Sequence, residues 1–225
     1  MGIYLIFGLV ALASWLVRQR FQRVMNELGQ QRTSSGLTGE QIAARMLQHY
    51  HVHNVQITAT GGMLTDHYNP GSRTVNLSEG VYQQPSIAAA AVAAHECGHA
   101  VQHAQAYSFL QMRSALVPVV SIASRFSPWL LLAGIFTLQS FPQIMLLGII
   151  ALAGSTLFSF ITLPVEFDAS KRALAYLEDS GLARGEELAQ AKKGLNWAAM
   201  TYVVAALGSL ATLIYYATIF MRSQD

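Results

Sequence analysis

Long apolar runs separated by polar blocks dominate the sequence of this 225-residue chain. Residues 3–17 carry no charge, residues 116–163 are apolar apart from Arg125 and a short polar turn at 139–143, and residues 199–221 form another apolar run. A helix of about 20 apolar residues crosses a bilayer. The pattern therefore predicts a mainly α membrane protein with about four transmembrane helices, the middle two forming a hairpin. The first is short, and tilt or local thinning must help it cross.

The basic residues predict the orientation of these helices. Most Lys and Arg residues fall in the two polar blocks, residues 18–115 and 164–198, and the hairpin turn has none. Because basic residues collect on the cytoplasmic side, we expect both blocks to be cytoplasmic, with the hairpin turn and both termini outside. Arg18 follows the first apolar run rather than preceding it, which predicts an uncleaved anchor. Arg222 falls on the far side, and Arg125 is expected at the interface.

Composition supports a membrane protein and excludes one class of partner. The chain is 52% hydrophobic and 12% charged, which is too apolar for an ordinary soluble domain. The net charge is +2, without a basic patch interleaved with aromatic residues, so nucleic-acid binding is not expected. The single cysteine, Cys97, excludes an intramolecular disulfide and is expected to be a small buried filler.

The first polar block is predicted to contain a small α+β unit. Thr38 to Gln41 is typical of a capping box, and the apolar residues that follow would form one face of a helix. Residues 55–58 and 73–78 are typical of strands, and an edge strand there could bind an extended peptide. His49, His51 and His53 would share a face if extended, but a metal site without a carboxylate is a weak hypothesis. Residues 30–36 are expected to form a flexible linker.

The sequence His95-Glu96-Cys97-Gly98-His99 matches H-E-x-x-H, the motif of zinc hydrolases. An Ala-rich run precedes it, which predicts a helix. On a helix, residues four apart share a face, so His95 and His99 can bind one metal while Glu96 reaches a bound water. The plainer alternative, a surface helix with two solvated histidines, does not fit the apolar flanks.

A catalytic zinc needs a third protein ligand. His103 lies about 12 Å of helical rise from His95 and would not share its metal. Glu166 is the better candidate because it follows Pro164, where a new helix can begin, and has the small residues Ala169 and Ser170 on the same side. The alternative is that Glu166 and Asp168 only favour a helix N-terminus through its dipole.

Four segments together resemble a known family: residues 66–70 (DHYNP), 74–78 (TVNLS), 95–99 (HECGH) and 163–170 (LPVEFDAS). They are similar to the YugP-type neutral zinc metallopeptidases of bacterial membranes, over nearly the whole chain. They are more distantly similar to gluzincins of the HtpX kind, in which a glutamate on a later helix completes the zinc site. The resemblance implies a gluzincin-like catalytic block, a bacterial cell membrane location and Glu166 as the third ligand.

The same resemblance raises the question of which residue supports the metal-binding histidines. In the distant relatives an aspartate four residues after the glutamate has this role, but this chain has Ser170 at that position. Either Ser170 or Asp168 is therefore expected to hydrogen-bond a histidine ligand.

These features predict a membrane-anchored zinc endopeptidase that binds one Zn²⁺ per chain, with Glu96 as general base and peptides or proteins as substrates. Membrane proteins are among the expected substrates. Two alternatives are an inactive zinc-binding scaffold that recognises partner proteins and an intramembrane protease. The residue that stabilises the oxyanion is left open among five candidates: His67, Tyr68, Arg73, His103 and Arg113.

Overall fold

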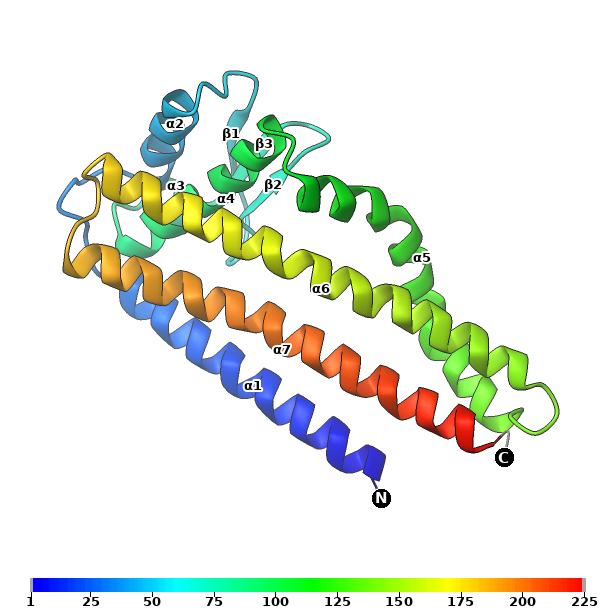
Figure 1. Cartoon of the computed structure of the whole chain (residues 1–225). Helices are drawn as coiled ribbons and strands as arrows, with labels where there is room; N and C mark the ends of the chain where they lie inside the picture. Colours follow the sequence, from blue (N-terminus) through cyan, green and yellow to red (C-terminus); the bar gives the residue numbers. More distant parts are fainter. Residues whose placement is uncertain (1, 224–225) are drawn as a thin grey trace. The chain divides into compact units, whose positions relative to one another are not determined.

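The computed structural model describes residues 2–223, and side chains from residue 5 onward. The chain divides into two compact units, one formed by residues 1–17, 111–163 and 201–225 and the other by residues 18–110 and 164–200. Three helices contribute to both units: α1 (Gly2–Gly29), α6 (Pro142–Asp179) and α7 (Glu186–Arg222) (Figure 1). A fourth, α5 (Ser108–Phe136), begins in the second unit and continues in the first.

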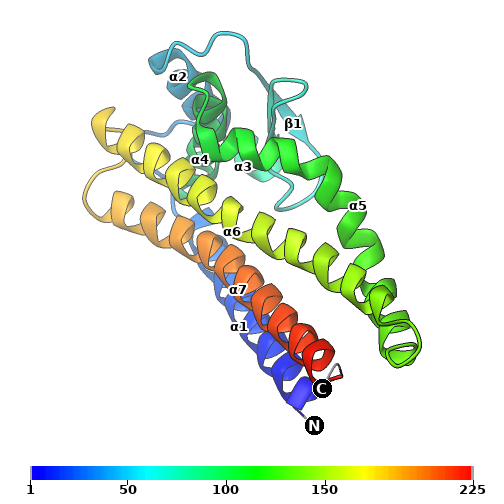
Figure 2. The same ribbon diagram turned by 45° about the vertical axis from the view of Figure 1, so that its right-hand side comes forward.

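The first unit is built from helices alone. Glycines permit close helix contacts: a Cβ at Gly134 of α5 would lie 2.5 Å from the Met145 Cα of α6, and one at Gly208 of α7 would lie 2.7 Å from Val10 of α1. The hydroxyls of Thr156 and Ser209 are 2.6 Å apart and join α6 to α7. Figure 2 shows α7 lying beside α1.

Three helices in the described part of the chain are long and apolar enough to cross a membrane, namely α5, α6 and α7. Helix α1 is not among them, so the structure supports three of the four predicted spans by length and composition. Large apolar side chains are exposed on all three, including Trp129, Ile150 and Leu207. Such surfaces are unusual in water and suit contact with lipid.

The second unit contains a small sheet and three short helices besides its shares of the long helices. Its remaining elements are α2 (Gly39–His49), β1 (Gln56–Thr60), β2 (His67–Asn69), β3 (Thr74–Ser78), α3 (Glu79–Gln83) and α4 (Ile87–Ala104). The strand order is β1-β3-β2, with β1 parallel and β2 antiparallel to β3. Ile42 and Met46 of α2 and Leu77 of β3 are fully buried in its core, which also surrounds α4.

The capping box at the start of α2 is confirmed. The Thr38 hydroxyl accepts a hydrogen bond from the Gln41 N–H, and the Gln41 side chain accepts one from the Thr38 N–H. The expected apolar face is also confirmed, since Ile42, Ala43, Met46 and Leu47 are buried. The helix therefore packs as its sequence pattern predicts.

Two sequence predictions about local structure are wrong. No new helix begins near Pro164, because α6 continues through it; a proline can sit inside a helix at the cost of one backbone hydrogen bond. The second wrong prediction concerns the linker and is described next. The condition for a shared face of His49, His51 and His53 is not met either, because His49 ends α2 and His51 has a φ of 56°.

Residues 30–36 are held by hydrogen bonds rather than forming a free linker. The Thr33 N–H donates to the Pro85 carbonyl at 3.0 Å, and the Ile87 N–H donates to the Gln31 carbonyl at 2.9 Å. The Ser34 N–H donates to a Glu187 carboxylate oxygen at 2.8 Å. The backbone of the segment makes these contacts, which fasten it to the start of α4 and to α7.

Candidate metal centre

Helix α4 carries both histidines of the H-E-x-x-H motif. The Ser86 hydroxyl caps the helix by accepting a hydrogen bond from the Ala89 N–H at 3.1 Å, and Ala-rich residues extend it to the motif. His95 and His99 are four residues apart, and their ring centroids are 4.8 Å apart. Both rings therefore lie on one face of the helix.

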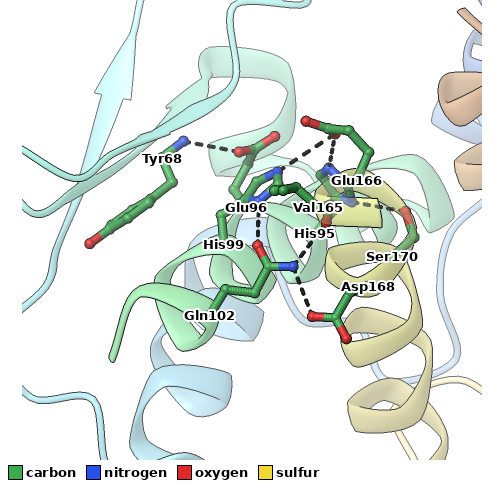
Figure 3. Close-up of polar contacts among 9 residues, drawn as sticks. All are labelled: Tyr68, His95, Glu96, His99, Gln102, Val165, Glu166, Asp168 and Ser170. Atoms are coloured by element: carbon green, nitrogen blue, oxygen red, sulfur yellow. Dashed lines mark hydrogen bonds and ion pairs between the residues drawn. The ribbon is translucent and has the colours of Figure 1, made fainter. Parts of the chain in front are cut away.

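Glu166 on α6 joins these rings (Figure 3). Its Oε2 atom lies 3.3 Å from His95 Nε2 and 3.7 Å from His99 Nε2. The potential ligand atoms of the three residues lie within 4.8 Å of one another, and Glu166 is only 3% exposed. Among the described residues, no other group of three or more His, Cys, Asp or Glu side chains is placed to hold a metal ion.

The charges in this cluster fit a cation. Burial opposes ionisation of Glu166, but hydrogen bonds with His95 and His99 outweigh it and hold the pKa of the carboxyl well below its usual range. Burial likewise lowers the pKa of His99, yet its hydrogen bond with Glu166 more than compensates and the pKa lies above its ordinary value. An ionised carboxylate with two imidazoles is a ligand set typical of catalytic zinc.

Gly98 allows α6 to approach the motif helix closely. A Cβ at Gly98 would lie 2.6 Å from the Ala169 carbonyl oxygen and 3.1 Å from the Ala169 Cα. These are backbone atoms, which cannot move aside as the end of a flexible side chain can. The small residues at positions 98 and 169 therefore let Glu166 reach the histidines.

Ser170 hydrogen-bonds His95. Its hydroxyl lies 3.1 Å from His95 Nδ1, the ring nitrogen opposite the one that faces Glu166. A serine one helical turn after Glu166 can therefore contact a histidine of the cluster directly. Asp168 is the other residue expected in this role, but it hydrogen-bonds neither histidine. Its carboxylate instead accepts a hydrogen bond from a residue that the sequence patterns did not identify.

That residue is Gln102, which is fully buried on α4. Its Oε1 atom is 3.0 Å from His99 Nδ1, while its Nε2 donates to the Val165 carbonyl and to the Asp168 carboxylate, both at 2.8 Å. Arg172 pairs with the same carboxylate oxygen. Gln102 comes three residues after His99 and so lies on the same side of α4. This spacing was the only feature of the sequence that pointed to a contact with His99.

The contacts of Gln102 determine the proton position on His99. A backbone carbonyl and a carboxylate only accept hydrogen bonds, so both must face the amide NH₂ group. The amide oxygen then faces His99 Nδ1, which must carry a hydrogen. When the ring is neutral, His99 Nε2 therefore carries the lone pair on the side of Glu166, which is the state that a metal ligand requires.

Glu96 is oriented by the sheet. The Tyr68 N–H on β2 donates to Glu96 Oε2 at 2.9 Å, and Glu96 is 8% exposed. The other carboxylate oxygen remains available for a further partner. The Tyr68 hydroxyl lies 2.7 Å from His103 Nδ1, and both residues line a cavity of about 480 Å³ with Arg73. Burial raises the pKa of the Tyr68 hydroxyl, which keeps it protonated.

The other residues that the sequence singled out belong to several elements. His67 is exposed on β2, with its Nδ1 2.7 Å from the Thr65 carbonyl oxygen. Arg113 belongs to α5, in the other unit. Cys97 is buried with its Sγ 3.6 Å from the Ala43 carbonyl oxygen, which confirms it as a small core residue.

The motif H-E-x-x-H on a helix is typical of zinc metallopeptidases. The chain belongs to the family described as "Putative neutral zinc metallopeptidase", whose model matches residues 3–221. It is 39% identical over 226 residues to "Putative membrane protease YugP" of Bacillus subtilis (strain 168), covering 99% of this chain and 98% of that protein. No solved structure matches the chain significantly.

Proposed function

We propose that this chain is a membrane-anchored, zinc-dependent endopeptidase. The observation that carries the proposal is the convergence of His95, His99 and Glu166 with Glu96 beside them. One Zn²⁺ per chain would be held by the first three residues. When bound, zinc makes water a stronger nucleophile at neutral pH and polarises a carbonyl.

The protein's own groups supply the proton transfers and the orientation. Glu96 acts as general base on the attacking water and later returns the proton to the leaving amine. The hydrogen bond from the Tyr68 N–H occupies one carboxylate oxygen and leaves the other for the water. Of the candidates, Tyr68 and His103 are the best placed to contact the substrate. Tyr68 on β2 hydrogen-bonds Glu96 through its N–H and His103 through its hydroxyl, and both residues line the same cavity.

The membrane arrangement remains part of the proposal. Helix α1 would serve as a fourth span, with both polar blocks cytoplasmic and the termini outside, as the basic residues indicate. Glu166 follows the end of the apolar run at Leu163 by only three positions, which supports a site near the cytoplasmic membrane surface. In a bacterial cell this would be the inner membrane.

Chelation tests the proposed activity. Detergent-purified protein should cleave an unfolded model protein, lose this activity with a zinc chelator and regain it when Zn²⁺ is added back. Mg²⁺ should not restore it, because it prefers octahedral oxygen ligands. Cleavage that persists without any metal would contradict the proposal.

Gln102→Leu is expected to weaken zinc binding by about 10- to 100-fold, the usual cost of removing a partner that orients a metal-bound histidine. It leaves His99 Nδ1 without its acceptor and the Asp168 carboxylate without one donor. Competition with a fluorescent chelator measures the affinity. Gln48→Leu on the exposed side of α2 is the matched control, and equal affinities in the two variants would refute the role of Gln102.

A further inference from the structure

A second hollow, of about 770 Å³, lies in the same unit as the metal cluster. It is bordered by the second half of α1, the loop between β1 and β2, the start of α3 and the first turns of α4. Apolar side chains form much of its lining: Met25, Met63, Leu64, Val81, Ala89 and Val92. We call it the apolar groove.

Two residues of the groove lining are close to Glu96 or to its hydrogen-bond partner, one on α4 and one just before β2. Val92 precedes Glu96 by one helical turn, so the two side chains lie on the same face of α4. Asp66, also in the lining, comes two residues before Tyr68, whose N–H binds Glu96. Two residues of the groove lining therefore lie close in the chain to the proposed general base or to the residue that binds it.

The two hollows lie on either side of Glu96 along α4. Val92 borders the apolar groove, whereas Ala100 and His103 border the cavity that contains Tyr68. Val92 and Ala100 are separated by about 12 Å of helical rise, which is the length of roughly four extended residues. An extended peptide passing Glu96 could thus place side chains in both hollows.

The loop that forms one wall exposes large apolar side chains. Met63 is 83% and Leu64 is 52% exposed. Leu64 has a φ of 58° and Gly62 one of 99°, and a left-handed backbone is costly for leucine. Exposed apolar residues on a strained loop beside a catalytic group are typical of a binding site rather than of a structural turn.

We propose that the apolar groove binds a large apolar side chain of the peptide substrate and that Val92, Met63 and Leu64 determine this specificity. The substrates would then be extended segments with Leu, Phe or Met next to the cleaved bond, such as unfolded or membrane-derived chains. This inference rests on the proposed peptidase function, but the groove can be tested without turnover.

Peptide binding to the inactive full-length Glu96→Gln protein tests the groove directly. Two fluorescent peptides would be compared, identical except for Leu or Gln at one position. Burying the leucine should favour its peptide by about tenfold or more. Val92→Phe fills the groove, and Leu64→Asn removes an apolar wall residue while introducing a residue that tolerates positive φ. Both variants should abolish the preference.

Phe109→Gln is the matched control, because it removes an apolar side chain of similar exposure, 40%, that does not line the groove. It should leave the preference unchanged. A missing preference, or one that survives Val92→Phe and Leu64→Asn, overturns the groove proposal. The two groove variants could abolish the leucine preference while the wild-type protein shows no metal-dependent cleavage. That result would support the groove but overturn the peptidase function.

Cleavage mapping gives a second test in the active protein. In a mixed peptide library, wild-type cuts should have large apolar residues enriched at one fixed position beside the cleaved bond. Val92→Phe should shift that position towards small residues, whereas general damage to the fold would slow all cuts equally. An unchanged sequence profile in Val92→Phe would overturn the proposal.

Discussion

Glu96→Gln is expected to retain zinc and lose peptide cleavage by about 10²- to 10⁴-fold, the usual contribution of a general base. Glutamine has nearly the same shape, and its amide oxygen can still accept the hydrogen bond from the Tyr68 N–H. It cannot accept a proton from water. The structure of the site should therefore survive while proton transfer fails.

Parallel assays of zinc content and cleavage rate on the purified variant check this expectation. Glu178→Gln is the matched control, since Glu178 is an exposed glutamate of α6 and should tolerate the change. If Glu96→Gln cleaves as fast as the control, the role of Glu96 is refuted. If neither the wild type nor the variant cleaves while both bind partners, the chain is the zinc-binding scaffold considered above.

Glu166→Ala is expected to lose most of the bound zinc, with affinity reduced by at least about 100-fold, because it removes a ligand rather than a group that only orients one. The variant leaves His95 and His99 without the carboxylate that faces both rings. Two neutral ligands bind zinc more weakly than three ligands that include a charge.

Metal analysis after gentle purification measures this loss, with Glu178→Ala as the control on the same helix. Asp168→Ala is unsuitable as a control, because Asp168 holds the amide of Gln102 and pairs with Arg172. Full zinc content in Glu166→Ala would show that another residue completes the site.

Local sequence patterns were sufficient to predict the elements that carry the ligands. Thr38 and Gln41 predicted their helix because a capping box acts within one turn, and His95 and His99 predicted a shared face because helical spacing does so. In both cases the physical constraint acts over a few neighbouring residues. Glu166 was identified differently, because a zinc site needs a third ligand and because the chain resembles a known family, and the helix start expected at Pro164 does not form.

Features that depend on tertiary contacts were missed. Gln102 looked like an ordinary helical glutamine, and its role depends on Val165 and Asp168, more than 60 positions away. Pro164 was read as the start of a helix, but the continuing packing of α6 outweighs its local preference. Residues 30–36 looked flexible because their partners, Pro85 and Glu187, are distant in sequence.

X-ray absorption at the zinc edge of the purified wild-type protein tests the central claim most directly, because it identifies the atoms bound to the metal. Ligation by His95, His99 and Glu166 predicts two imidazole nitrogens at about 2.0–2.1 Å and oxygen ligands at about 2.0–2.2 Å. A sulfur ligand near 2.3 Å would have to come from Cys97, the single cysteine, and would contradict the account. Fewer than two imidazoles would contradict it as well.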